Sequence, residues 1–233
     1  MNQEPASASR GDGVDHGPPA AESYTWPLTA IVVAILPQVL IPVRDRVGPP
    51  SVVPIAEGAV VLIMLVIAAR PGPVSQRARP VVLALLGVLI VANAGAAARL
   101  VDLVLNGGKV DGVALSAGRL LVAGALVLFT NVITFGVLYW ELDLDGPAGR
   151  VADSVPYPDF QFPQTVTRGL AAPNWRPHFL DYLYVAYTNI VAFSPTDTMP
   201  LTGRAKALMA LQSLISVSVL VVVLARVINI LPT

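Results

Sequence analysis

Residues 205–231, AKALMALQSLISVSVLVVVLARVINIL, decide the class of fold. This run of 27 residues contains only two charged side chains, Lys206 near its start and Arg226 near its end. The hydrocarbon core of a bilayer is about 30 Å thick, and a helix of about 20 apolar residues is long enough to cross it. The run therefore predicts a transmembrane helix.

The composition of the whole chain also indicates a membrane protein. Of its 233 residues, 55% are hydrophobic and only 13% are charged, whereas about 25% is typical of soluble domains. The formal net charge is zero, so nothing favours nucleic acid as a partner. The chain has no cysteine and only two histidines, which excludes disulfides, thiolate metal sites and multi-histidine metal sites. We expect no metal and no cofactor.

Four further apolar segments precede the last run, at residues 26–43, 52–69, 81–105 and 115–140. The first three form an N-terminal group of spans within residues 26–110, behind a polar and disordered tail at residues 1–25. The fourth begins the C-terminal half, residues 115–233. A bias toward Ala, Val, Leu and Arg suggests a bacterial protein. We expect an all-α membrane protein with about five transmembrane helices plus one re-entrant segment, multi-pass in the inner membrane.

The re-entrant segment is expected where the C-terminal half becomes too short to span. A polar, proline-rich loop at residues 141–177 contains the stretch YPDFQFP at 157–163, whose alternation of aromatic residues and proline suggests ordered packing. The apolar segment 179–193 has only 15 residues and leads into polar residues 194–200 before the final span, 205–231. Irregular backbone at membrane depth is tolerated only where protein buries it or water reaches it. The pattern therefore predicts a half-helix that returns to the side it entered from.

Residues 184–204, YVAYTNIVAFSPTDTMPLTGR, resemble the pore helix, filter loop and inner-helix start of the two-span pore module of potassium channels. The matching residues are Tyr184 and Thr188 in the pore helix and then Asp197, Pro200, Thr202, Gly203 and Arg204. The resemblance implies that 115–140 is the outer helix, that 179–193 is pore-helix-like and that 205–230 is the inner helix. It also implies that several subunits assemble around this half. The same features resemble an uncharacterised prokaryotic family of polytopic membrane proteins.

The selectivity filter of the channel family is not retained. Where that family has Val-Gly-Tyr-Gly, this chain has Phe-Ser-Pro-Thr at residues 193–196. The potassium filter depends on rings of backbone carbonyls, and its glycines adopt backbone angles that are closed to proline and β-branched residues. The pore-loop-like residues that the resemblance implies are Thr188, Ser194, Thr196 and Asp197. Asp197 fits an ordinary turn equally well, because Ser, Thr and Asp are favoured in turns.

Ionisable residues at membrane depth are candidate functional residues, because each costs about 2.5–3.5 kcal/mol at the centre of a helix. Three are expected here: Glu57, Arg99 and Asp102. Glu57 is a proton or cation site, an interfacial carboxylate near a helix end, or a carboxylate paired with an arginine. Arg99 and Asp102 are three residues apart and are expected to pair with each other.

Two further pairs of polar residues are expected to have structural roles. His178 and Asp181 begin the half-length segment, where a carboxylate in the first turn suits the helix dipole, so we expect them to cap it. Asn93 and Asn131 lie within predicted spans and are expected to form hydrogen bonds between helices.

Three classes of function compete. The main interpretation is ion or small-solute permeation through a degenerate pore loop. The alternative is a non-conducting structural or complex-assembly protein whose contact surface is the 141–177 loop. An enzyme would need polar residues to converge near Asp159, His178 and Asp181, but the chain has no Gly-x-Ser-x-Gly, His-Glu-x-x-His or phosphate-loop motif. We therefore expect no enzyme and no catalytic residue, and as partners the lipid bilayer with further copies of the chain or other membrane subunits.

Overall fold

The computed structural model describes residues 22–40, 55, 58–59, 61–63, 65–66, 79–107, 109–110, 113–152, 155–167, 169–172, 175–192 and 197–230. Within these residues the fold is mainly helical, with two short two-stranded sheets. Three helical stretches are long and apolar enough to cross a membrane: Arg79–Leu105, Ala117–Ala152 and Gly203–Asn229. The protein is therefore an α-helical membrane protein, the class that the final apolar run predicts.

The helices, in chain order, are α1 (Thr25–Leu40), α3 (Arg79–Leu105), α4 (Ala117–Leu142), α5 (Gly146–Ala152), α6 (Pro163–Val166), α7 (Phe179–Val191) and α8 (Gly203–Ile230). A 3₁₀ turn, η2 (Asp143–Asp145), joins α4 to α5. The strands β1 (Lys109–Val110) and β2 (Val113–Ala114) form one antiparallel pair, and β3 (Phe160–Gln161) and β4 (Met199–Pro200) form another.

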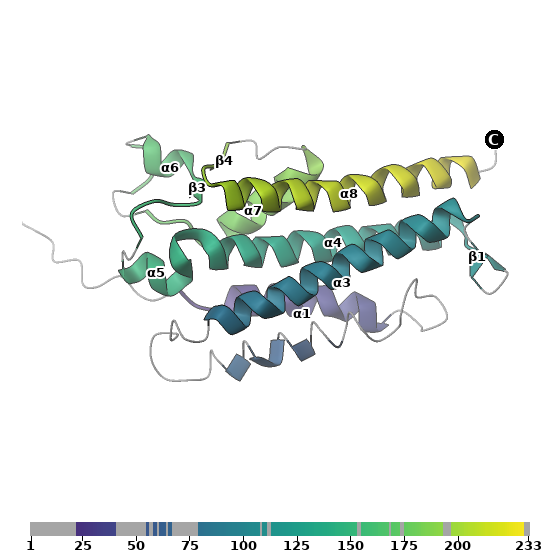
Figure 1. The fold of residues 1–233 in the computed structure, drawn as a ribbon, viewed down its shortest axis with the longest axis horizontal. Coiled ribbons are helices and arrows are strands. Elements are labelled where there is room, and N and C mark those ends of the chain that lie inside the picture. The colour runs from purple at the N-terminus through teal and green to yellow at the C-terminus, as the bar shows by residue number, and fades with distance from the viewer. Residues whose placement is uncertain are drawn as a thin grey trace, which may run out of the picture.

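Helix α4 is the centre of the bundle, because α1, α3, α7 and α8 all pack against it. Figure 1 shows α3, α4 and α8 running lengthwise beside one another. Arg79 at the start of α3 donates a hydrogen bond of 3.2 Å to the backbone oxygen of Glu141 near the end of α4. Near the other end, Arg226 in α8 donates to the backbone oxygen of Gly107 just after α3, over 2.8 Å. Helices α3 and α8 are therefore parallel to each other and antiparallel to α4.

The two ends of the bundle differ. The end of α4 continues into η2, α5 and the β3–β4 pair, and we call this the loop end (Figure 1). The opposite end carries the β1–β2 turn between α3 and α4, and we call it the hairpin end.

Helix α7 starts at the loop end, and the chain returns to that end before α8 begins. The ring of Phe179 lies 6.1 Å from the ring of Trp140, near the end of α4. Ten residues later, the side chain of Asn189 donates to the backbone oxygen of Met209 within α8, over 3.0 Å. β4 then pairs with β3 beside the start of α8 (Figure 1). Helix α7 ends two residues before the predicted limit of the segment 179–193.

Two glycines of α4 allow its neighbours to approach closely. A Cβ atom on Gly136 would lie 2.9 Å from Cδ1 and 3.1 Å from Cα of Leu183 in α7. A Cβ atom on Gly124 would lie 3.2 Å from the side chain of Val223 in α8. Small residues at helix contacts are the usual device for close packing in membranes, and they seat α7 and α8 directly on α4.

The N-terminal region differs from its expected boundaries. Residues 1–21 of the expected tail and most of the expected span 52–69 lie outside the described residues. Tyr24, in contrast, is buried, with its ring 4.9 Å from that of Trp140, so the end of the expected tail belongs to the fold. Helix α1 has 16 residues as described, and the residues that directly follow Leu40 lie outside the described part of the chain. A total of about five spans stays a prediction.

The expected loop at residues 141–177 contains the short elements η2, α5, β3 and α6. Phe160 and Phe162 are buried. The Phe160 ring lies 5.0 Å from that of Tyr139, and the Phe162 ring lies 5.3 Å from that of Tyr182. The ordered packing predicted for residues 157–163 is therefore confirmed, and the region is a folded cap on the loop end of the bundle.

Candidate functional site

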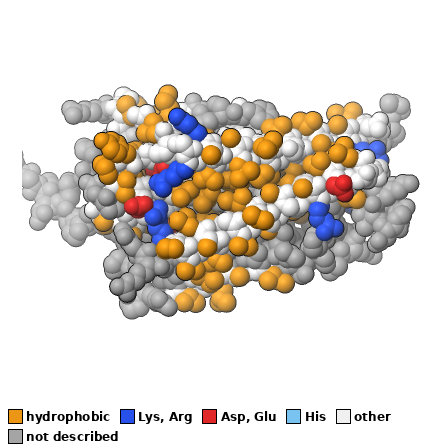
Figure 2. Space-filling model, viewed as in Figure 1, with side chains coloured by type: hydrophobic (Ala, Val, Ile, Leu, Met, Phe, Trp, Pro, Cys, Tyr) orange, Lys and Arg blue, Asp and Glu red, His pale blue; other side chains and the backbone are white. Residues whose placement is uncertain are grey.

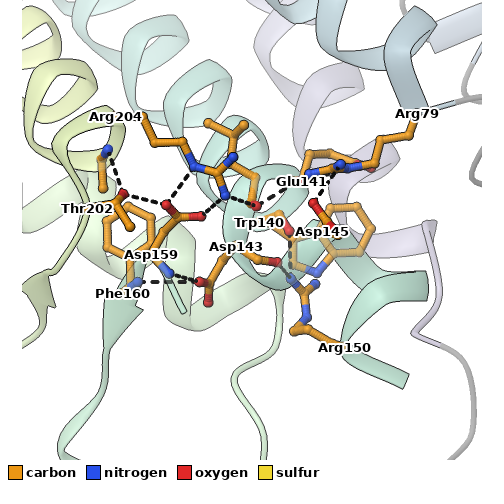
Figure 3. Close-up of polar contacts among 12 residues, drawn as sticks. Arg79, Trp140, Glu141, Asp143, Asp145, Arg150, Asp159, Phe160, Thr202 and Arg204 are labelled. Atoms are coloured by element: carbon orange, nitrogen blue, oxygen red, sulfur yellow. Dashed lines mark hydrogen bonds and ion pairs between the residues drawn. The ribbon is translucent and has the colours of Figure 1, made fainter. Parts of the chain in front are cut away.

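A network of charged side chains lies at the loop end, where α4 gives way to η2 and α5 (Figure 3). We call it the polar clamp, and its members are Glu22, Arg79, Asp143, Arg150, Asp159 and Arg204. They come from segments far apart in the sequence, including the region before α1 and the starts of α3 and α8. The clamp therefore joins most of the fold at one place.

Asp143 is the centre of the clamp. Its Oδ1 accepts hydrogen bonds from the backbone nitrogens of Asp159, at 2.6 Å, and Phe160, at 3.3 Å. Its Oδ2 accepts a hydrogen bond of 2.6 Å from the hydroxyl of Tyr182 in α7. This buried carboxylate therefore ties the β3 segment and α7 to the end of α4.

Arg150 in α5 is buried and satisfied by four acceptors. Its Nε and Nη2 donate to the two carboxylate oxygens of Glu22 over 2.7 and 2.9 Å, the bidentate geometry that arginine favours with carboxylates. Its Nη1 donates to the backbone oxygens of Trp140, at 2.8 Å, and Asp143, at 2.9 Å. The guanidinium also lies 5.2 Å from the centre of the Tyr182 ring, within cation–π range. Arg150 thus fixes the region before α1 to the end of α4.

Asp159 fixes the start of α8. Its carboxylate accepts from Nε of Arg204 at 2.7 Å and from Nη2 at 2.5 Å. The hydroxyl of Thr202 donates to the same carboxylate over 2.5 Å, and the backbone nitrogen of Leu201 donates to the backbone oxygen of Asp159 over 2.8 Å. Thr202 and Arg204, two residues of the channel resemblance, therefore serve here to attach α8 to the β3 segment.

The turn between α4 and α5 requires an unusual backbone. Leu144, Asp145 and Gly146 have positive φ angles of 51°, 61° and 76° in succession. A Cβ atom on Gly149 would lie 2.1 Å from the backbone oxygen of Leu144, so only glycine fits there. Arg79 pairs with Asp145 at 2.9 Å on the outside of this turn. The turn brings α5, and hence Arg150, back against α4.

A second buried carboxylate, Glu141, lies beside the clamp. Its Oε1 has no hydrogen-bond partner among the residues that the structure describes. Tyr24, which precedes α1, is its neighbour. Burial, together with the charge of Glu141, raises the pKa of the Tyr24 phenol well above its ordinary value, so this phenol stays protonated.

The polar groups on the inner face of α7 are occupied by contacts within the chain. Nδ2 of Asn189 donates to the backbone oxygen of Met209, at 3.0 Å, and to Oε1 of Gln212, at 2.8 Å. The hydroxyl of Tyr139 donates to the same Oε1 over 2.7 Å. Nε2 of Gln212 donates to the backbone oxygen of Ala186 over 2.9 Å. This seam of buried side chains joins α4, α7 and α8.

The outer face of α7 is exposed, apolar and aromatic. With α1 and α4 it lines a groove of about 780 Å³, whose lining includes Trp26, Phe129, Tyr184 and Tyr187. Tyr184 and Tyr187 are 52% and 51% exposed. In the described part of the chain, neither hydroxyl forms a hydrogen bond. Figure 2 shows that hydrophobic side chains also cover much of the molecule on the side it presents.

The predicted pore-loop residues do not form one site in the described residues. Thr188 is largely buried, and its hydroxyl donates over 3.0 Å to a backbone oxygen of the preceding helical turn. Asp197 is exposed, and its Oδ1 accepts a hydrogen bond of 3.4 Å from the hydroxyl of the adjacent Thr198. Ser194 and Thr196 lie outside the described residues.

The predicted intramembrane ionisable residues also lie apart from the clamp. Glu57 is outside the described residues. Arg99 and Asp102 are both exposed near the hairpin end of α3. The carboxylate of Asp102 accepts a hydrogen bond of 2.8 Å from the side chain of Asn106. No ion pair joins it to Arg99 in the described structure, so the predicted pairing is wrong.

The predicted cap of α7 is confirmed. The backbone nitrogen of His178 donates to Oδ2 of Asp181 over 2.7 Å, and the backbone nitrogen of Asp181 donates to the backbone oxygen of His178 over 2.9 Å. Both residues of the cap are therefore used to start the helix, and Asp159 is used to attach α8.

Sequence reasoning missed Asp143 and Arg150, which organise the polar clamp, and Gln212, which organises the buried seam of α7. Their partners are distant in the sequence: Arg150 is 128 residues from Glu22, and Gln212 is 73 residues from Tyr139. One pattern pointed to the first two, namely charged residues inside a loop whose aromatic stretch predicts ordered packing. Gln212 stood as a single amide inside an apolar span, where interhelical hydrogen bonding is the usual role.

No metal centre accompanies these residues in the described structure, where no group of three or more His, Asp or Glu side chains converges. Comparison with known proteins gives no relative, since no protein-family model, no curated protein and no solved structure matches the chain. The fold and the site together define an α-helical membrane protein whose half-length helix is fixed by a polar clamp at the loop end.

Proposed function

We propose that this protein is a non-conducting structural membrane protein that assembles with further copies of itself through the outer face of α7. One observation carries the proposal. The polar groups on the inner face of α7 form hydrogen bonds within the chain. The outer face is aromatic and exposed, and it carries two tyrosine hydroxyls.

In this proposal, α7 is a re-entrant segment in one leaflet of a bacterial inner membrane that the chain crosses about five times. Its 13 residues rise about 20 Å, which is less than the hydrocarbon core of about 30 Å. The return of the chain to the loop end before α8 supports this placement.

The tyrosines favour a protein partner over lipid chains on this face. Tyr184 and Tyr187 are the sixth and ninth residues of α7, so their hydroxyls lie below the start of the helix. A hydroxyl surrounded by hydrocarbon loses its hydrogen bonds at a cost in free energy. Tyrosine is enriched at protein interfaces, where its ring is buried and its hydroxyl finds a partner. A second copy of the chain can bury the tyrosine rings and supply partners for their hydroxyls. The channel resemblance also implies that several subunits assemble around the C-terminal half.

The polar clamp and the buried seam around Gln212 support the same role, because together they hold α7 in place. The bond from Tyr182 to Asp143 fixes the start of α7, and the bonds from Asn189 fix its deeper part. A surface that is already ordered loses less entropy when it binds a partner.

Native mass spectrometry of the full chain released from lipid nanodiscs tests the proposal. We expect an oligomer that shifts toward monomer when Tyr184→Phe and Tyr187→Phe are combined, because only the two hydroxyls are removed. The matched control is Tyr157→Phe, at a tyrosine that is 79% exposed outside α7. A wild-type chain that is monomeric at every concentration contradicts the proposal, as does an assembly with a different membrane protein that excludes a second copy.

Permeation of ions or small solutes is the second candidate. The exposed Asp197 and the hydroxyls of Tyr184 and Tyr187 favour it, since they would line a wet space between subunits. Flux measured in proteoliposomes separates the two candidates. A conducting protein gives a flux above that of empty liposomes, and this flux falls in the Asp197→Ala variant. A structural protein gives no flux above that of empty liposomes, either as the wild type or as the variant.

A further inference from the structure

Each of the three long helices carries a buried polar side chain at its middle. Asn93 is the 15th of the 27 residues of α3, and Asn131 is the 15th of the 26 residues of α4. Ser216 is the 14th of the 28 residues of α8. All three are at most 2% exposed. We call them the midplane layer.

Helical spacing puts Asn131 and Ser216 on the faces of α4 and α8 that pack against each other. This contact is anchored nearer the hairpin end, where a Cβ atom on Gly124 would meet Val223 at 3.2 Å. The two helices are antiparallel, so the loop end lies toward higher residue numbers in α4 and toward lower numbers in α8. Seven residues from Gly124 in that direction lead to Asn131, and seven residues from Val223 lead to Ser216. Seven residues are close to two helical turns, so both return to the contact face.

Asn93 belongs to the face of α3 that packs on α4 and α8. The buried residues of α3 form one stripe, with spacings of three and four, that contains Asn93: Val82, Leu86, Leu89, Asn93, Ala97, Leu100 and Val104. This spacing keeps the residues on a single side of the helix. The layer is therefore a polar section across the core of the α3–α4–α8 bundle.

The layer has hydrogen-bonding groups that the described residues leave unpaired. Neither amide atom of Asn131 has a partner among them, nor does Nδ2 of Asn93. Because both amide atoms of Asn131 are unpaired, this holds whichever of the two is the nitrogen. The hydroxyl of Ser216 donates to the backbone oxygen of Gln212 over 2.9 Å, so its oxygen can still accept. Buried amides without partners are unfavourable in an apolar core.

The unpaired groups define the ligand that satisfies them. It must accept hydrogen bonds from the Nδ2 groups of Asn93 and Asn131, and it must also donate one to Oδ1 of Asn131. A metal cation cannot accept from the amide nitrogens, and a simple anion such as chloride cannot donate to the amide oxygen. Water does both, and buried waters usually bridge two to four polar groups. We propose that the midplane layer binds water between Asn93 and Asn131 in the core of the α3–α4–α8 bundle.

Solid-state NMR of the full chain in lipid bilayers, with ¹⁵N-labelled asparagine, tests this site. Magnetisation transferred from water is followed to each side-chain amide, with signals assigned from Asn→Leu variants. The matched control is Asn189, which is 3% exposed but whose amide nitrogen already donates to Met209 and Gln212. We expect transfer to Asn93 and Asn131 several-fold faster than to Asn189. Transfer to Asn131 that is no faster than to Asn189 overturns the proposal.

A double-mutant cycle tests the site without spectroscopy. If water bridges the two amides, Asn93→Leu and Asn131→Leu each lower the thermal midpoint of unfolding. Each substitution leaves the remaining buried amide without part of its hydrogen-bonding network. The double variant then recovers to at least the wild-type midpoint, since an apolar layer needs no water. A dry layer gives the opposite pattern, in which each single variant raises the midpoint and the two increases add.

Discussion

The hydroxyl group of Tyr182 in α7 donates a hydrogen bond of 2.6 Å to the carboxylate of Asp143, 39 residues earlier at the end of α4. Both residues are buried. A helix of 13 residues is marginal by itself, so α7 depends on contacts of this kind for its position and its stability.

Tyr182→Phe removes this hydrogen bond and keeps the aromatic ring. We expect a loss of about 1–3 kcal/mol in the free energy of unfolding, because the buried Asp143 carboxylate loses a donor. Denaturant unfolding in detergent micelles measures it. Tyr157→Phe is the control, since that side chain is exposed, and an equal loss in both variants would contradict the role of the contact.

Arg150 and Glu22 are expected to be strongly coupled. Arg150→Met leaves the Glu22 carboxylate without its cationic partner. Removing one member of a buried ion pair lowers the free energy of unfolding by about 3–5 kcal/mol. The variant with both Arg150→Met and Glu22→Gln should lose clearly less than the sum of the two single variants. A double-mutant cycle on the free energy of unfolding measures the coupling, and a coupling energy near zero would count against a buried pair.

Gly149→Ala should be among the most destabilising small substitutions in the chain. The added Cβ would lie 2.1 Å from the backbone oxygen of Leu144, so the turn before α5 must open and move Arg150. Gly95→Ala is the matched control, because nothing lies within 4 Å of its added Cβ and alanine favours the helix by up to about 1 kcal/mol. In thermal unfolding, the midpoint should fall for Gly149→Ala and rise for Gly95→Ala. Equal midpoints for the two variants would contradict the tight turn.

Gln212→Leu should loosen α7 selectively. The substitution removes the acceptor shared by Tyr139 and Asn189 and the donor to Ala186. Hydrogen exchange followed by mass spectrometry should then show faster exchange across α7, with α3 unchanged. Uniformly faster exchange in all helices would indicate a general loss of stability instead of a local anchor.

The sequence was sufficient for the parts of the fold that depend on local pattern. Apolar length alone predicts α3, α4 and α8, and the short run at 179–193 predicts a helix that the structure ends at Val191. The cap made by His178 and Asp181 follows from the preference for a carboxylate in the first turn. These features need no knowledge of distant residues.

The rest depends on contacts across the chain. Arg150 meets Glu22 only because three successive positive φ angles reverse the chain after α4, and composition does not reveal that turn. The expected pairing of Arg99 with Asp102 fails because both side chains are exposed and Asn106, one turn beyond Asp102, supplies a closer donor. Sequence spacing identifies possible partners, but tertiary packing selects among them.

Single-cysteine labelling tests most directly whether the chain enters and leaves the membrane on one side around α7. The protein has no cysteine, so each variant carries one thiol. Leu170→Cys and Asp197→Cys flank α7, and Asn106→Cys lies at the hairpin end; all three positions are exposed. In sealed vesicles of known orientation, a membrane-impermeant maleimide should label positions 170 and 197 from the same side and position 106 from the other. Labelling of 170 and 197 from opposite sides would show that the segment 179–193 crosses the membrane and would contradict the account.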